Sequence, residues 1–161
     1  TYPQATSTVL VGQLPARTLT RPYLAVVHGR ARAADGVVNA PIGRHPRDRV
    51  KMAVRPAGRG KRAVTRYRVL ERFPHFTLLE LHLETGRTHQ IRVHLASLGH
   101  PVVGDQVYGK PRLRPPIELD GYALHAAGLK FVHPDFRKAV ELAAPVPARM
   151  ERLLIHLRNS H

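Results

Sequence analysis

The sequence predicts an α+β domain in which helices flank a mostly antiparallel mixed sheet. Two kinds of pattern favour this class: short runs of alternating apolar and polar residues, typical of strands, and helical spacing at residues 88–98 and from residue 147 onward. Size is the third observation, because 161 residues with 43% hydrophobic residues suffice for one domain with a real core. We find no internal repeat and no linker that divides the chain.

The first expected strand lies near the start of the chain. Residues 1–20 are weakly patterned and predict at most a short helix, around Val9, Leu10 and Leu14. Residues 21–29 form an apolar run that predicts a strand ending at Gly29. Asp35 and Gly36, which precede a short apolar run, are a typical hairpin-turn pair.

Residues 62–73 and 75–84 predict two strands that pair antiparallel around Phe73-Pro-His75. On the first strand, Tyr67 shares a face with small and apolar residues, whereas Arg66 and Arg68 lie on the other face. On the second strand, leucines alternate with polar residues, at Leu79, Leu81 and Leu83 against Glu80, His82 and Glu84. This alternation predicts a half-buried strand.

A helix is expected directly after this strand. Gly86 ends the strand, and Thr88 is the expected N-cap of the helix. Apolar residues then recur at helical spacing until Gly99 ends the helix, at Ile91, Leu95 and Leu98.

Basic residues crowd the first turns of this helix, where the helix dipole disfavours cations. They are Arg87, His89 and Arg92. A glycine turn with free N–H groups and extra arginines predicts a seat for an anion, either a phosphate or a carboxylate. Arg92 lies beside the apolar stripe, so we expect it to be partly buried against an anionic partner. A solvated helix start with incidental charges is the alternative.

The C-terminal part predicts a loop, a hairpin and a helix. Residues 110–116 form a basic, proline-rich loop, and residues 122–133 and 136–142 predict a hairpin that turns at Pro134 and Asp135. We expect His125 to be a structural residue. Pro147 opens a final helix whose apolar stripe predicts core packing, at Met150, Leu153, Leu154 and Leu157.

The chain is strongly basic, with 26 Lys and Arg against 11 Asp and Glu, a net charge of +15 and a pI near 11.4. Such an excess indicates a polyanionic partner, nucleic acid first and an anionic membrane surface second. No apolar run reaches the ~18 residues of a membrane span, and no helix has a basic amphipathic face, so we expect no membrane partner. The absence of cysteine excludes disulfides, thiolate catalysis and cysteine-ligated zinc, and favours the cytoplasm.

Basic residues are concentrated in residues 44–68, against the single acid Asp48. Pro56, Gly58 and Gly60 predict a loop or hairpin tip in the middle of this segment. A charge run is often only a solvated face, but this run has one sign and lies in loops, which favours RNA contact. We expect the RNA-binding residues to be Arg44, Arg47, Arg49, Lys51, Arg59, Lys61, Arg62, Arg87 and His89.

Cofactor signatures are missing from the sequence. It contains no phosphate-binding G-x-x-x-x-G-K-[ST] loop, no strand-linked G-x-G-x-x-G and no H-E-x-x-H. The 11 histidines are scattered, and the acids do not cluster as a magnesium-dependent nuclease requires. We therefore expect neither a metal nor a cofactor.

Two motifs follow one another in the centre of the chain, Thr85-Gly-Arg-Thr-His-Gln-Ile-Arg-Val-His94 and Gly99-His-Pro-Val-Val-Gly-Asp-Gln-Val-Tyr-Gly109. Shorter ones are Pro22-Tyr-Leu-Ala-Val-Val27, Pro41-Ile-Gly-Arg-His-Pro46, Ala63-Val-Thr-Arg-Tyr67 and Leu124-His-Ala126. In this order, and from about Leu10 onward, they resemble the RluA-type pseudouridine synthases. The ribosomal large-subunit pseudouridine synthase D group is the most similar branch.

The resemblance implies a monomeric, cofactor-free enzyme that acts on large-subunit ribosomal RNA. Enzymes of this family flip a uridine out of the RNA, detach the uracil, rotate it and reattach it through carbon. By motif, Tyr23 corresponds to the family's active-site tyrosine, which stacks on the base; without the resemblance it would be interpreted as a core or strand-edge residue. Arg92 corresponds to the arginine that pairs with the catalytic aspartate. A cation beside a carboxylate in a dry pocket keeps that carboxylate ionised.

The sequence departs from the family in its nucleophile. Family members carry it in a His-Arg-Leu-Asp type motif before the tyrosine strand, and this sequence has no such motif. We therefore expect residues 1–161 to be the C-terminal portion of a single catalytic domain, without the nucleophile segment and the N-terminal RNA-binding domain, and inactive alone. Asp105 is a candidate substitute, but its motif predicts a turn in which it caps backbone N–H groups. A non-catalytic basic RNA-binding module fits the charge and strand content equally well.

Overall fold

The computed structural model describes residues 22–160 except 111, 127, 133–138 and 144–145. The short helix expected around Val9 and the turn expected at Pro134 and Asp135 lie outside the described residues. In the described part of the chain, neither helix is long and apolar enough to cross a membrane.

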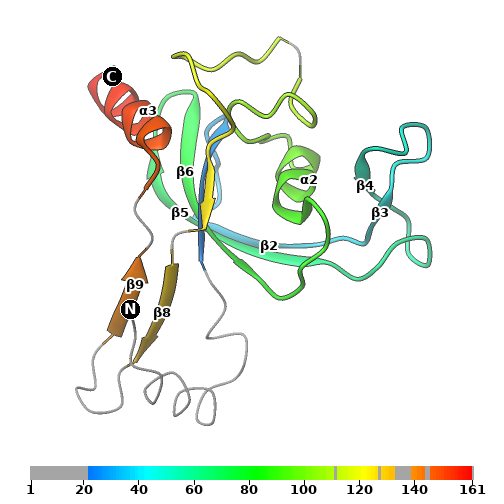
Figure 1. Ribbon diagram of the computed structural model, residues 1–161. Helices are drawn as coiled ribbons and strands as arrows, with labels where there is room; N and C mark the ends of the chain where they lie inside the picture. The colour runs from blue at the N-terminus through cyan, green and yellow to red at the C-terminus, as the bar shows by residue number, and fades with distance from the viewer. Residues whose placement is uncertain (1–21, 111, 127, 133–138, 144–145, 161) are drawn as a thin grey trace.

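A five-stranded sheet in the order β2-β5-β6-β1-β7 forms the centre of the structure (Figure 1). Its strands are β1 (Tyr23–His28), β2 (Asp35–Asn39), β5 (Val64–Arg72), β6 (Phe76–Leu83) and β7 (Leu124–Ala126). Each neighbouring pair in this sheet is antiparallel. The α+β class is confirmed, and the predicted strand at residues 21–29 is β1.

Two smaller hairpins and two helices complete the described structure. The hairpins are β3 (Ile42–Arg44) with β4 (Met52–Val54), and β8 (Gly128–Val132) with β9 (Ala139–Ala143). The helices are α2 (Gln90–Ser97) and α3 (Ala148–Asn159). The β3–β4 hairpin extends beyond α2, away from the sheet, and carries the predicted basic loops (Figure 1).

The predicted pairing of β5 with β6 is confirmed, but β6 is more deeply buried than a half-buried strand. Five consecutive residues from Thr77 to Leu81 are buried. Glu80, which the alternation placed on the solvent side, is only 6% exposed and pairs with Arg68 at 3.0 Å. The reason is its central position, because Leu24 of β1 and Arg68 of β5 lie directly opposite Glu80 on either side of it.

The turn expected at Asp35 and Gly36 is wrong, since both residues belong to β2 and pair with β5. Gly36 lies opposite Tyr67, and a Cβ at this position would stand 2.5 Å from the Tyr67 hydroxyl. The glycine therefore allows the tyrosine ring to approach the backbone closely, as glycine in a strand often does.

The helix α2 begins later than Thr88, the expected N-cap. The N-cap is His89, which has a left-handed backbone (φ 55°) and no side-chain capping bond. The side chain of Gln90 serves the preceding turn instead, because its Oε1 accepts hydrogen bonds from the Arg87 N–H and the Thr85 hydroxyl. At the other end, Gly99 (φ 86°) closes the helix as predicted, in a Schellman arrangement.

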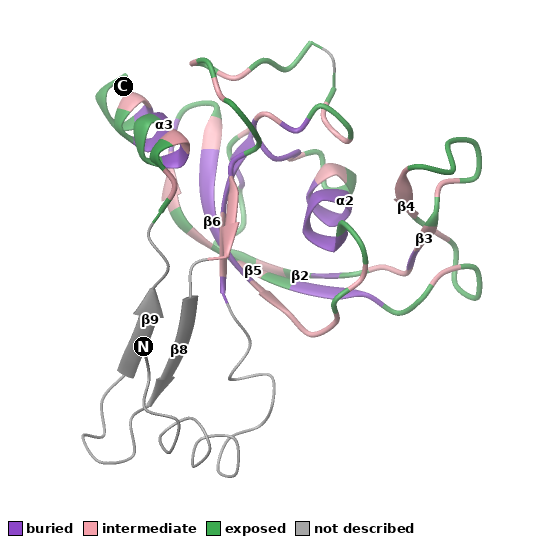
Figure 2. Ribbon diagram, viewed as in Figure 1, coloured by how far each residue is buried: buried purple, intermediate pink, exposed green. Residues whose placement is uncertain are grey.

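One hydrophobic core joins both helices to the sheet (Figure 2). Ile91 and Leu95 of α2 pack with the buried side chains of β1 and β6. The apolar stripe predicted for the final helix is buried in α3 at each of its four positions, Met150, Leu153, Leu154 and Leu157. This packing fixes the angle at which α2 presents its polar residues.

Candidate functional site

A buried ion pair connects the first turn of α2 to the turn at residues 104–109. Arg92 donates from Nε to Oδ2 of Asp105 at 2.8 Å and from Nη2 to Oδ1 at 2.9 Å. The Arg92 side chain is 9% exposed and the Asp105 side chain 0%. The anionic partner expected for a buried Arg92 is thus a carboxylate of this chain, 13 residues further on.

Asp105 also organises its own turn. Its Oδ1 accepts the backbone N–H groups of Val107 and Tyr108, each at 3.0 Å, so the predicted capping role is confirmed. Gly104 (φ 86°) permits the close approach of the neighbouring segment, because a Cβ there would stand 2.5 Å from the carbonyl oxygen of Gly121. One carboxylate therefore holds both the turn and the arginine.

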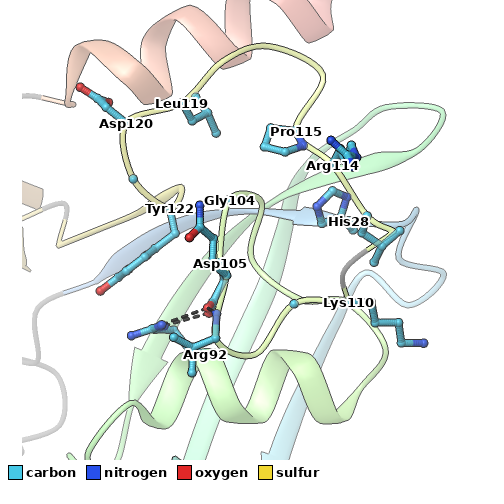
Figure 3. Close-up of a pocket in the computed structure, with 15 residues that line it drawn as sticks. His28, Arg92, Gly104, Asp105, Lys110, Arg114, Pro115, Leu119, Asp120 and Tyr122 are labelled. Atoms are coloured by element: carbon cyan, nitrogen blue, oxygen red, sulfur yellow. Dashed lines mark hydrogen bonds and ion pairs between the residues drawn. The ribbon is translucent and has the colours of Figure 1, made fainter.

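Two tyrosine rings cover the Arg92 guanidinium. Its central carbon lies 5.0 Å from the ring centroid of Tyr108 and 4.3 Å from that of Tyr122. Both distances are within the range of cation–π attraction. Figure 3 shows the ring of Tyr122 beside Arg92, with the two side chains extending toward the same side.

The charges of this pair stabilise each other. Burial alone raises the pKa of Asp105, but hydrogen bonds from Arg92 and from the Tyr108 and Val107 N–H groups outweigh burial and hold that pKa below its ordinary value. The hydrogen bond to Asp105 raises the pKa of Arg92. Both groups are therefore charged at neutral pH.

Arg92 and Asp105 lie in the wall of a cleft of about 840 Å³, a size that admits a small molecule or a nucleotide. Residues from the segments 104–110 and 113–122 form most of its rim, and His28 at the end of β1 closes one side (Figure 3). Exposed basic side chains at this rim are Lys110 and Arg114.

A second, basic groove of about 600 Å³ lies between the β3–β4 hairpin and the start of α2. Four of the predicted RNA-binding residues line it together: Arg44, Arg59, Lys61 and Arg87. Arg62 does not line the groove and lies 3.7 Å from Glu84, and Arg47, Arg49 and Lys51 lie in the hairpin connection outside it. The fold thus brings together only part of the predicted set.

The Tyr108 hydroxyl joins the two regions. It accepts the backbone N–H of Met52 in β4 at 3.0 Å and lies 2.7 Å from Nδ1 of His89. Burial lowers the pKa of His89, and the charge on Arg92 lowers it further. The structure thus places His89, a predicted RNA-binding residue, as a hydrogen-bond partner of the Tyr108 hydroxyl.

Comparison with known proteins decides the family. A family model described as RNA pseudouridylate synthase matches residues 4–97, more than half of the chain. The chain belongs to the RNA pseudouridylate synthase family. The motif resemblance to the RluA-type enzymes and their D group is thereby confirmed.

Relatives in this family are similar over most of the chain. It is 52% identical over 162 residues to the ribosomal large subunit pseudouridine synthase D of Xanthomonas campestris, covering 94% of this chain and 48% of the relative. It is 50% identical over 151 residues to an uncharacterised RNA pseudouridine synthase of Bacillus subtilis, again covering 94% of this chain and 48% of the relative. The chain therefore spans about half the length of these curated relatives.

Two solved human structures share the fold. They are the RNA pseudouridylate synthase domain containing 1 protein (TM-score 0.66, 26% identity) and the domain containing 4 protein (TM-score 0.65, 25% identity). The matches cover 97% of this chain and 71% of the first structure, and 98% and 69% for the second.

The two residues expected to be catalytic in this pseudouridylate synthase family member lie in different settings. Arg92 lines the cleft, whereas Tyr23 is not among the described residues that line it. Tyr23 begins β1, pairs with Leu81 and Ala126, and is half-buried against the core. Its catalytic role stays a prediction.

Sequence reasoning missed the two tyrosines that cover Arg92. Tyr108 belongs to the second central motif, three residues after Asp105, and this membership is its only signal in the sequence. Tyr122 carries no such signal, because the approach of residue 121 to Gly104 brings it to Arg92. In the described part of the chain, no group of three or more His, Asp or Glu is arranged to hold a metal.

Proposed function

We propose that this chain is part of an RNA uridine isomerase that converts uridine to pseudouridine in large-subunit ribosomal RNA. The observation that carries the proposal is Arg92, a buried arginine at the wall of a cleft, at the position of the family's aspartate-pairing arginine. The names of the similar D-type synthases support the large ribosomal subunit as the target.

The proposed reaction needs a nucleophilic aspartate from outside the residues of this chain. Asp105 does not suit this role, because both of its oxygens are engaged and its side chain has no exposed surface. In the proposal, residues 1–161 form the C-terminal portion of one catalytic domain. An upstream segment supplies the nucleophile, and Tyr23 stacks on the flipped base. Such an enzyme would work as a monomer in the cytoplasm without a cofactor.

The basic groove fits the RNA backbone in this scheme. Its four cations come from β3, from the loop between β4 and β5 and from the turn before α2, and they form a one-signed surface next to α2. Phosphate contacts of this kind supply affinity without sequence information. The groove therefore holds the RNA while the cleft selects the reacting base.

The test is tritium release from large-subunit rRNA that carries 5-tritiated uridine. We expect release by the gene product with its upstream sequence, none by residues 1–161 alone, and a loss of turnover in the Arg92→Ala variant of the longer product. Arg158→Ala, which removes an exposed arginine on α3, is the control and keeps turnover. Release by the short chain would contradict the external nucleophile.

The same basic groove supports a second candidate function, a non-catalytic RNA-binding module. In a binding module, Arg92→Ala weakens the RNA affinity of the folded protein, whereas in the enzyme it removes turnover and leaves the affinity of the folded protein close to that of the wild type. RNA binding without tritium release by either the short or the extended protein would favour the module.

A further inference from the structure

We propose that Asp105 is a positioning residue for the reaction and holds Arg92 so that one end of its guanidinium faces the reacting groups. The inference rests on the proposed function, because Asp105 acts through Arg92.

Asp105 occupies one whole edge of the guanidinium. It accepts from Nε at 2.8 Å and from Nη2 at 2.9 Å, a bidentate pairing that fixes the plane of the group. Among the described residues, none accepts a hydrogen bond from Nη1. The rings of Tyr108 and Tyr122 restrict the guanidinium from tilting out of its plane. The end that carries Nη1 is left for a ligand.

The residue that holds Arg92 is itself held firmly. Oδ1 of Asp105 accepts two backbone N–H groups in addition to Arg92, and the side chain is 0% exposed. The close approach at Gly104 fixes the backbone directly before it. Asp105 therefore orients Arg92 before any substrate arrives, which is the preorganisation that a catalytic cation requires.

The pairing with Asp105 also limits how far Arg92 can lower the pKa of a second carboxylate. A nucleophilic aspartate that approaches Nη1 makes an end-on contact, because Asp105 already occupies the bidentate edge. Since Asp105 shares the positive charge, the nucleophile is kept ionised without being fully neutralised. Without the charge of Asp105, Arg92 would pair with the nucleophile more strongly and lower its pKa.

The experiment uses the gene product that contains this chain, with Asp105→Asn as the first variant. Asparagine keeps a carbonyl oxygen for the Val107 and Tyr108 N–H groups, but sets an N–H group against Arg92. We expect kcat for tritium release to fall on the order of 100-fold, the effect of a misplaced catalytic group. The KM for rRNA should change by less than about twofold, because the contacts that bind substrate and transition state equally well are unchanged. The acid limb of the pH–rate profile should move to lower pH.

Two further variants separate the alternatives. Glu71→Gln removes a carboxylate that pairs with exposed Arg158 through Nε and Nη2, and should leave kcat and the pH profile unchanged. Asp105→Glu keeps the charge but displaces the carboxylate, so positioning predicts a loss of kcat and a role of charge alone predicts none. It also serves if Asp105→Asn fails to fold.

The outcomes separate the positioning role of Asp105 from the proposed function. A loss of kcat in both Asp105 variants, with KM retained, supports positioning. An active wild type with unchanged kcat in the folded variants, or a rise in KM alone, overturns the inference but leaves the proposed function. A wild-type gene product that binds rRNA and releases no tritium overturns both.

Discussion

Replacing Arg92 by methionine should strongly destabilise the fold, because it leaves Asp105 charged, buried and without its cation. Methionine keeps much of the apolar volume of the arginine stem, so the loss of stability reports mainly on the missing charge. Removing one partner of a buried ion pair costs about 3–5 kcal/mol. The 0% exposure of the Asp105 side chain favours the upper part of that range, whereas its two remaining backbone N–H bonds moderate the cost.

Arg158→Met is the matched control. Arg158 pairs with Glu71 through the same two kinds of nitrogen, but the two side chains are 48% and 35% exposed. Exposed pairs contribute about 0–1 kcal/mol, because water screens and solvates them. The two variants thus remove the same kind of ion pair at sites that differ in burial.

The assay is urea unfolding of the gene product, followed by circular dichroism at several pH values. In the wild type the folded-state pKa of Asp105 is lowered, so its stabilisation is present above the unfolded pKa and is lost as pH falls through the folded value. In Arg92→Met we expect burial, the largest single influence on this carboxyl, to outweigh the two backbone N–H bonds and to raise the folded pKa above the unfolded one. The stability that depends on this group is then regained as pH falls. Equal destabilisation by Arg92→Met and Arg158→Met at neutral pH would refute the reasoning.

Three further changes test the turn, the groove and the aromatic cover. Gly104→Ala should destabilise the protein more than Gly58→Ala, by about 1–3 kcal/mol, in the same unfolding assay. The two glycines have φ of 86° and 87°, but only at Gly104 would a Cβ meet the backbone, so equal losses would exclude a steric cause. The double change Arg59→Ala and Lys61→Ala should weaken rRNA binding and reduce the slope of log affinity against log salt by roughly 0.7–0.9 for each phosphate that is no longer neutralised, measured by filter binding. An unchanged slope, as expected for the exposed α3 control Arg152→Ala, would remove the groove from the RNA interface. Tyr122→Leu should cost about 0.5–2 kcal/mol of cation–π energy in urea unfolding while Tyr122→Phe costs little, and equal losses would point to the hydroxyl instead of the ring.

The strands β1, β5 and β6 and the helix α3 were predictable because the spacing of their apolar residues is visible in the sequence. The alternating leucines of β6 and the four-residue stripe of α3 show this directly, although β6 is buried more deeply than its alternation predicts. The start of α2 was not predictable, because the Gln90 side chain reaches back to Arg87 and Thr85 and across to the Val64 carbonyl in β5. Such a cap depends on tertiary contacts that local propensity does not contain.

The candidate site, too, was predictable from the sequence only in part. Burial of Arg92 and its need for an anion follow from its place beside the apolar stripe. The choice of Asp105 as partner does not, because it depends on how the segment after α2 returns to the sheet, where Val103 bonds to Val26 and Ala123 bonds to Val103. Gly36 was misinterpreted for a similar reason, since its function is set by Tyr67 on the neighbouring strand.

The Tyr108 hydroxyl has a consequence for how the protein moves. It bonds to the hairpin at Met52 and to His89, while its ring covers Arg92 and its backbone N–H bonds to Asp105. In the proposed enzyme, RNA that displaces the hairpin must either break the Met52 bond or pull on the turn that positions Arg92. Tyr108 would then couple RNA binding in the groove to the orientation of Arg92.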